Sequence, residues 1–162
     1  MKVLKLVLFS LIFIMLFAIS GCKKYEDGPL ISLRTKEARL TGEWDVEYFS
    51  INGYDSTSYL KSQSFYGKYL FGKDEIHNKK LFVYKNSSTV IPNYNGDGYW
   101  MFLNHKESVY IHYDYLTSGP TVGPFRANDI TWEIKRLKNK ELWLKTQYAG
   151  KEYFVKFIIS PS

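Results

Sequence analysis

The chain has 162 residues, of which 22 are basic and 16 acidic, and its formal net charge of +6 is too diffuse to predict nucleic-acid binding without a clustered patch. Its length predicts one domain of ordinary size, and its 18% content of aromatic residues predicts a packed core and excludes intrinsic disorder. The single cysteine excludes an intramolecular disulfide and any zinc site built from several cysteines.

Residues 1–21 have the pattern of a secretory signal. Lys2 and Lys5 form a short positive stretch, and the run from Leu6 to Ile19 has Ser10 as its only polar side chain. As a helix at 1.5 Å per residue this run would span about 21 Å, well short of the roughly 30 Å hydrocarbon core of a bilayer. The pattern therefore indicates a signal peptide and not a transmembrane helix.

The signal ends in Ile19-Ser20-Gly21-Cys22, which resembles the lipobox of bacterial lipoproteins: an aliphatic residue, two small residues and the cysteine that becomes the mature N-terminus. The resemblance implies that Cys22 carries a thioether-linked diacylglycerol and an acyl chain on its amine. Two or three such chains, at about 0.8 kcal/mol per buried CH₂, anchor a protein stably in a bilayer. The alternative is an ordinary secretory signal in which the cysteine occurs by chance.

Residues 22–30 are predicted to be a lipidated tether, because the stretch is charged and contains Gly28-Pro29. Position 23 is Lys and not the Asp that retains many Gram-negative lipoproteins in the inner membrane. The resemblance thus implies an outer-membrane location, on either its periplasmic or its exposed side. Glu26 and Asp27 belong either to a surface-export signal or to an ordinary solvated tether.

Residues 31–162 are predicted to form one domain that opens with a short helix. Leu33, Glu37 and Leu40 recur there at helical spacing, which is consistent with one or two turns before the first strand.

From Gly42 the pattern changes to a period of two, which is typical of a half-buried strand. Asn52-Gly53 then supplies a turn dipeptide that tolerates positive φ, so a hairpin is expected after this strand. The apolar residues Trp44, Val46 and Tyr48 alternate with the acidic residues Glu43, Asp45 and Glu47.

The rest of the chain predicts further short strands separated by turn residues, with no convincing long helix. Eight or nine strands joined by short loops indicate an all-β antiparallel fold, and an up-and-down barrel is the common way to remove sheet edges at this size. A sandwich is the alternative. The strands are expected at 66–73, 80–84, 98–103, 108–113, 130–137, 141–148 and 151–159.

Two features resemble the lipocalin and related calycin barrels. The triplet Gly42-Glu43-Trp44, where the first strand begins, is similar to their Gly-x-Trp signature, and the stretches 130–137, 140–144 and 150–157 are similar to the last three strands of lipocalin-like bacterial lipoproteins. The resemblance implies an eight-stranded (or nine-stranded) barrel in which Trp44 has a structural role. It packs at the closed end, against a basic side chain for which Arg136 and Lys156 are candidates.

The connection from Asp114 to Asp129 exceeds the usual hairpin length, and such loops often cover or form binding sites. It contains Tyr115 and Phe125, which are apolar enough to cover a barrel mouth. The loop is expected either to cover the mouth or to pack on the outside of the barrel. If a small apolar ligand binds, Tyr115 and Phe125, together with Tyr99 or Met101 from a central strand, are its expected contacts.

No motif for catalysis, a cofactor or a metal is found in the chain. The histidines His77, His105 and His112 lack the spacing that would bring two of them to one metal ion. Asp45 and Glu47 lie two apart on the first strand, but they alternate with core residues and are expected to face water. We therefore predict no catalytic residues, no metal and no cofactor.

Two functions remain open. The first is a membrane-anchored lipoprotein that binds a small apolar ligand inside its barrel, without enzymatic activity. The second is a structural lipoprotein whose barrel is filled by its own large side chains and which docks a protein partner in an envelope complex. The volume of the lumen distinguishes them, because a filled barrel cannot bind a ligand saturably. An enzyme is the third and least favoured class.

Overall fold

The structure is a computed structural model that describes residues 33–62, 68–73, 80–83, 96–116 and 123–160. The signal segment and the tether, with Cys22, lie outside these residues. Within them, no helix is both long enough and apolar enough to span a bilayer.

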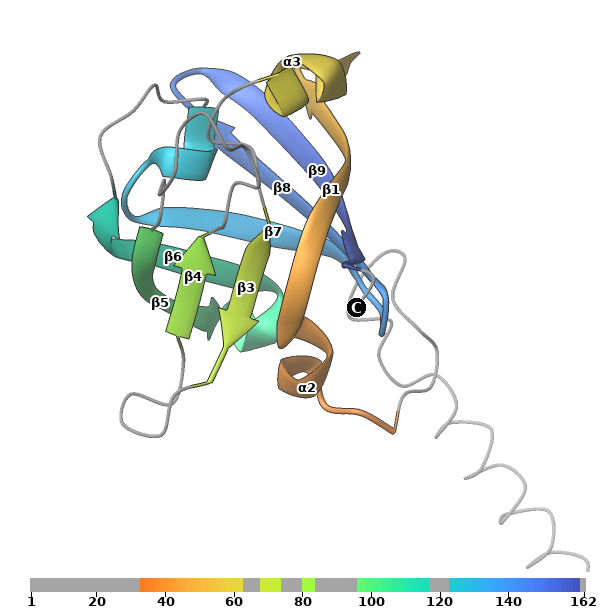
Figure 1. Cartoon of the computed structure of the whole chain (residues 1–162), viewed down its shortest axis with the longest axis vertical. Helices are drawn as coiled ribbons and strands as arrows, with labels where there is room; N and C mark the ends of the chain where they lie inside the picture. The colour runs from red at the N-terminus through yellow and green to blue at the C-terminus, as the bar shows by residue number, and fades with distance from the viewer. Residues whose placement is uncertain (1–32, 63–67, 74–79, 84–95, 117–122, 161–162) are drawn as a thin grey trace, which may run out of the picture.

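Among the described residues, one antiparallel sheet forms the body of the molecule and two short α-helices accompany it, so the predicted all-β fold with a short N-terminal helix is confirmed (Figure 1). Helix α2 precedes the first strand and α3 follows the first hairpin, while two 3-10 turns, η1 and η2, lie in later connections. The helical elements are α2 (Lys36–Leu40), α3 (Thr57–Ser62), η1 (Asn104–Lys106) and η2 (Gly123–Arg126). The strands are β1 (Gly42–Ile51), β2 (Tyr54–Asp55), β3 (Tyr69–Gly72), β4 (Lys80–Val83), β5 (Gly96–Leu103), β6 (Ser108–Leu116), β7 (Ile130–Leu137), β8 (Glu141–Tyr148) and β9 (Lys151–Ile159).

From β3 to β9 each strand pairs with the next, and β1 then joins the two ends of the series. Gly42 to Trp44 of β1 pair with β3, whereas Trp44 to Ile51 pair with β9. The curled sheet is therefore closed at the Gly42 end of β1. Towards Ile51, β1 pairs within the described residues with β9 and the short β2 but not with β3.

Helix α2 lies across the closed end of the curled sheet (Figure 1). It begins where the Thr35 hydroxyl accepts a hydrogen bond from the Ala38 amide, as an N-cap does. The Trp44 indole donates to the Leu40 carbonyl at 2.9 Å, and the buried Arg39 donates to the Leu137 carbonyl at 2.6 Å. Trp44 is fully buried, so it belongs to the part of the core that fills the closed end of the sheet.

The basic candidates for packing against Trp44 lie elsewhere. Arg136 and Lys156 are on the outer face, with the Arg136 guanidinium carbon 3.9 Å and the Lys156 ammonium 4.5 Å from the centroid of the Trp143 ring. The expectation for Arg136 was wrong because a register shift between Ile134 and Arg136 turns its side chain to the outer face of β7. The expectation for Lys156 was wrong because this residue alternates with the buried Val155 and Phe157 along β9. Arg39 is the basic residue buried at this end.

The predicted alternation in β1 holds for Trp44 and Val46 but is wrong for Tyr48. A β-bulge between Val46 and Tyr48 inserts one residue, so Phe49 takes the next core position and is fully buried. Tyr48 instead lies on the outer face opposite Lys156. The predicted turn at Asn52-Gly53 is confirmed, with φ of 52° and 81°.

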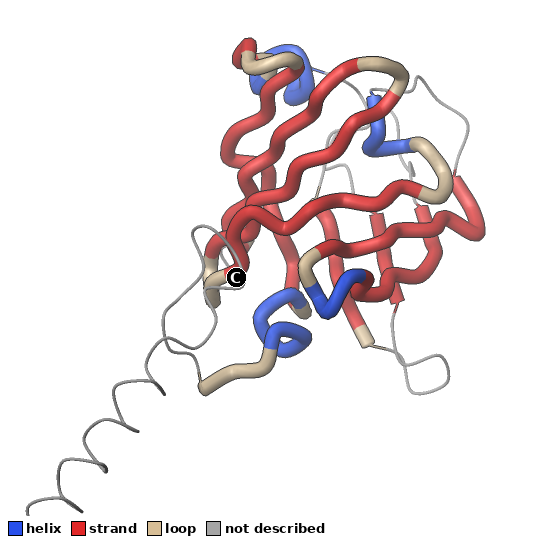
Figure 2. Tube along the Cα trace, turned by 180° about the vertical axis from the view of Figure 1, so that it is seen from behind, coloured by secondary structure: helices blue, strands red, loops and turns tan. Residues whose placement is uncertain are grey.

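Aromatic and aliphatic side chains from every part of the sheet fill its interior, and the strands show the expected alternation of buried and exposed residues in β7, β8 and β9. Figure 2 shows from behind how these strands wrap around that interior. The largest fully buried side chains are Trp44, Trp100, Phe49, Phe71, Leu40, Leu60, Leu137, Leu142 and Leu144.

Gly98 is expected to be indispensable for the pairing of β5 with β6. A Cβ at this position would lie 2.0 Å from the backbone carbonyl oxygen of His112, so Gly98→Ala must push the two strands apart. We expect it to lower the free energy of unfolding by about 3 kcal/mol or more, measured by urea denaturation. The control is Gly53→Ala, which meets no atom within 4 Å and should cost only about 1 kcal/mol for its positive φ. Equal costs for both variants would contradict this account.

Candidate functional site

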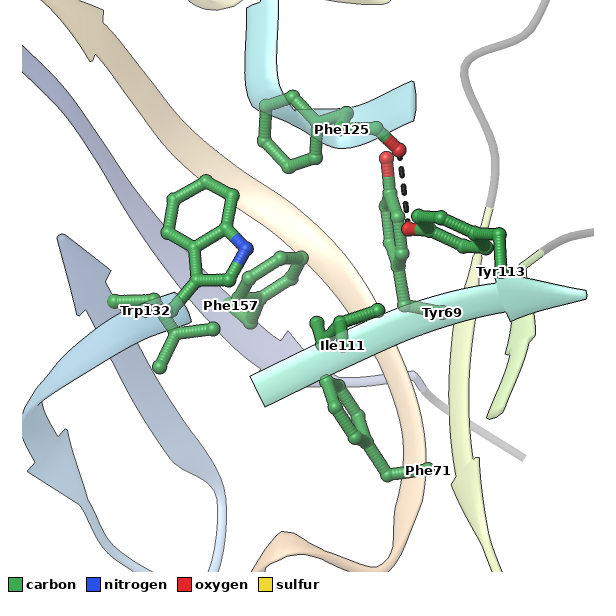
Figure 3. A pocket seen from close by; sticks show the side chains of 8 residues that line it. Tyr69, Phe71, Ile111, Tyr113, Phe125, Trp132 and Phe157 are labelled. Carbon is green, nitrogen blue, oxygen red and sulfur yellow. Dashed lines mark hydrogen bonds between the residues drawn. The ribbon is translucent and has the colours of Figure 1, made fainter. Parts of the chain in front are cut away.

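The described residues enclose a small apolar pocket beneath η2 (Figure 3). Its volume is about 10 Å³, enough for roughly one water molecule. A ligand the size of a fatty acid needs a pocket of roughly 300–1,000 Å³. The lining consists of Tyr69, Phe71, Ile111, Tyr113, Phe125, Trp132, Leu144 and Phe157.

Phe125 occupies the space above this pocket. Its side chain is only 4% exposed, and its ring centroid lies 5.2 Å from that of Phe49, 5.7 Å from that of Tyr69 and 5.6 Å from that of Trp132. These tilted arrangements are favourable for aromatic pairs. Phe125 therefore behaves as part of the core, and it occupies the position that a ligand entering from this side would take.

Two contacts hold the Phe125 segment in place. The buried Tyr113 hydroxyl donates a hydrogen bond to the Phe125 carbonyl at 3.0 Å, as Figure 3 shows. Gly123, with a φ of 55°, lies so close to β9 that a Cβ would be 2.5 Å from the Tyr153 ring. A glycine is thus needed for this turn to settle onto the sheet interior.

The sequence-predicted contacts do not meet in one site. Phe125 lines the pocket, but Tyr99 and Met101 lie on the outer face of β5, on either side of the inward-facing Trp100. The backbone of Tyr115 belongs to β6, and its side chain is outside the described part of the structure. Gly42 lies at the closed end, where its strand pairs with β3.

A cluster of polar and aromatic side chains lies on the outer face of β5 and β6. The Asp129 carboxylate accepts hydrogen bonds from the Tyr110 hydroxyl and, at 2.7 Å, from the His112 Nδ1. The Tyr99 ring stacks on the His112 ring with centroids 4.8 Å apart, and Asp114 lies 3.5 Å from the His112 Nε2. The sequence did not predict this cluster because its members are spread over three segments.

The electrostatics of the cluster follow from these bonds. Donation by Tyr110, and then by His112, lowers the pKa of Asp129 below its usual value. The same bond raises the pKa of Tyr110, because the Asp129 charge disfavours a second anion beside it. No group of three or more metal-ligating side chains exists among the described residues.

The cluster ties the connection between β6 and β7 to β6. Asn128 adds to it by accepting a hydrogen bond from the Tyr113 amide at 3.0 Å. Asp129, which has a positive φ of 60°, is the last residue before β7. Four hydrogen bonds from β6 thus hold the segment that carries Phe125 in place. The geometry of the cluster therefore supports a structural role.

A scan of the chain against models of protein families found no match, and a search of curated proteins found none either. The resemblance to lipocalin-like lipoproteins therefore rests on the sequence motifs.

We expect the Asp129 carboxylate to contribute to stability in a pH-dependent way. Because its folded pKa is lowered, its contribution is fully present above the unfolded value of about 3.9 and is lost as the pH falls through the folded pKa. Asp129→Asn should therefore unfold at lower temperature than the wild type at pH 7, and the difference should shrink towards pH 2. Thermal unfolding followed by circular dichroism across this range measures it.

Tyr110→Phe is the matched control for this experiment. It keeps the carboxylate but removes its main donor, so the acid-sensitive part of the stability should become smaller. A stability difference between the wild type and Asp129→Asn that is the same at every pH would contradict the assignment.

Proposed function

We propose that the chain is a membrane-anchored lipoprotein whose lipocalin-like barrel is filled by its own side chains and serves, without enzymatic activity, to dock a protein partner in the cell envelope. The anchor is Cys22, and the expected location is the outer membrane. Neither a metal nor a cofactor takes part in this function.

The observation that supports this proposal is the packing of the interior. The apolar pocket beneath η2 has room for about one water, and the buried Phe125 ring lines it. Of the two functions that the sequence left open, a filled barrel that acts through its surface agrees better with this packing than a carrier does.

Exposed tyrosines mark a surface for the partner. Tyr54 is 79% exposed, Tyr59 is 54% exposed and Tyr148 is 37% exposed. They lie in the first hairpin, in α3 and at the end of β8, all at the end of the molecule opposite α2 (Figure 1). Tyrosine supplies a large contact area and a hydrogen-bonding hydroxyl at low entropic cost, which suits protein recognition.

A small apolar ligand is the second candidate. The pocket is lined only by apolar and aromatic side chains. One residue, Phe125, which belongs to the short 3-10 turn η2, blocks it. Withdrawal of that turn would enlarge the pocket. This candidate requires the Tyr113 bond to the Phe125 carbonyl to break first.

The lumen is tested with the chain from Lys23, which retains every core residue that the structure describes. Titration with an environment-sensitive apolar dye and with fatty acids, followed by tryptophan fluorescence, should show no saturable binding to the wild type. Phe125→Ala should lose about 3–5 kcal/mol of stability and bind a small aromatic such as indole in the space it creates. Saturable one-to-one binding of a fatty acid to the wild type would favour the carrier.

The anchor is tested separately in cells that process lipoproteins. Metabolic labelling with a fatty-acid analogue should label the wild-type chain, and the labelled chain should partition into the detergent phase with Triton X-114. Cys22→Ser should remove both properties because the thiol that receives the diacylglycerol is gone. Detergent-phase partition of the Cys22→Ser chain without label would mean that residues 1–21 remain attached, and labelling of that chain would contradict the assignment of Cys22.

A further inference from the structure

The described segments at the end of the molecule that carries α2 are strongly basic. Four described segments meet there, namely residues 34–41, Lys73, the turn 104–107 and the turn 138–140 (Figure 1). They contain seven basic residues but only two acidic ones. The basic residues are Arg34, Lys36, Arg39, Lys73, Lys106, Lys138 and Lys140, and the acidic ones are Glu37 and Glu107.

The fold brings these segments together. On one side of α2 the Glu37 carboxylate lies 3.5 Å from the Lys73 ammonium at the end of β3. On the other side Arg39 donates to the Leu137 carbonyl, immediately before the turn between β7 and β8. Figure 2 shows the 3-10 turn η1 at the same end as α2. Residues that are far apart in the sequence therefore form one basic surface, which we call the basic end.

Most of these cations reach solvent. Arg34, Lys73, Lys106 and Lys140 are exposed and Lys138 is half-buried, whereas Arg39 and the ammonium group of Lys36 are buried.

The opposite end is electrically balanced. Its described segments, residues 52–62, 123–129 and 148–152, contain three basic and three acidic residues. The described part of the molecule is thus polarised, with its excess positive charge at one end. A charge distribution of this kind orients a protein in the field of a charged surface.

The chain leaves the described domain from the basic end, because Leu33 precedes α2. Eleven residue steps separate Cys22 from Leu33, and a chain of this length reaches at most about 40 Å when fully extended. A lipid on Cys22 therefore keeps the domain close to the bilayer, and the tether reaches the bilayer from the basic end.

We propose that the basic end is a membrane-contacting surface that binds the anionic headgroups of the bilayer in which the protein is anchored. Each Lys or Arg near an anionic surface strengthens binding, and a basic patch adds to the hold of the acyl chains. In this orientation the exposed tyrosines at the other end point away from the membrane. The inference rests on the proposed lipid anchor, but the binding of headgroups by the basic end can be measured without it.

The test uses the unlipidated chain from Lys23 and two kinds of vesicle, one of phosphatidylcholine alone and one containing 30% phosphatidylglycerol. Co-sedimentation in low salt should show binding to the anionic vesicles and not to the neutral ones. Binding should disappear in 1 M NaCl, where the screening length is about 3 Å.

Two triple variants with the same net charge locate the surface. Lys106→Gln, Lys138→Gln and Lys140→Gln remove three cations from the basic end, and together they should weaken binding on the order of a hundredfold. The matched control is Lys61→Gln, Lys145→Gln and Lys151→Gln, which removes three cations from the other half of the molecule and should change binding much less. Thermal unfolding of both variants verifies that they fold.

Each other outcome overturns the proposal. Equal losses in the two triple variants would mean that net charge alone attracts the chain, and no binding of the wild type to anionic vesicles would exclude a membrane-contacting surface. Binding to the soluble polyanion heparin without binding to vesicles would indicate a polyanionic partner instead. Because this chain carries no lipid, these results are independent of whether Cys22 is acylated, which the labelling experiment decides.

Discussion

The double pairing of Trp44 is the constraint on which the rest of the structure depends. This one residue faces Tyr69 of β3 on one side and Ile159 of β9 on the other, so the first and last strands of the series meet at its position. Its indole also donates a hydrogen bond to the carbonyl of Leu40, the last residue of α2. The closure of the sheet, through the Trp44 backbone, and the position of the helix, through its indole, therefore depend on the same residue.

The described part of the interior is filled by aromatic and aliphatic side chains. Aromatic rings reach it from β1, β3, β5, β7 and β9, and Phe125 adds one more from a connection. Rings of this size fill a small curled sheet when they pack with tilted planes, as the pairs around Phe125 do. On the surface, the described segments of the two ends differ in charge and in exposed tyrosine.

The strands were predicted best where turn residues mark both ends. The bounds of β7, β8 and β9 agree with the sequence for this reason, although a register shift interrupts the alternation in β7 and Trp143 and Phe154 lie on the outer face. Helix α3 had no such signal in Thr57–Ser62, and the bulge that turns Tyr48 outward leaves no trace in the pattern. A bulge changes the face of every residue that follows it, which also explains why Arg136 is not the partner of Trp44.

The candidate site was less predictable for two physical reasons. The stretch Tyr99–Phe102 is apolar on both faces, so the sequence could not decide that Trp100 points inward while Tyr99 and Met101 point outward. The role of Phe125 was predicted only in part. Its loop was expected to lie over the mouth or outside, but the ring lies within the core. The cluster around Asp129 depends on register between distant segments, which no local motif encodes.

The row of side chains across the outer face of β7, β8, β9 and β1 has a further consequence. Arg136, Trp143, Lys156 and Tyr48 lie opposite one another in register, so cations and aromatic rings alternate across four strands. The Lys156 ammonium lies 4.5 Å from the Trp143 centroid and 5.4 Å from that of Tyr48. Each of the two rings thus has a cationic side chain beside it. An outer face that would otherwise be apolar is thereby kept polar enough to disfavour association of two copies of the domain through it.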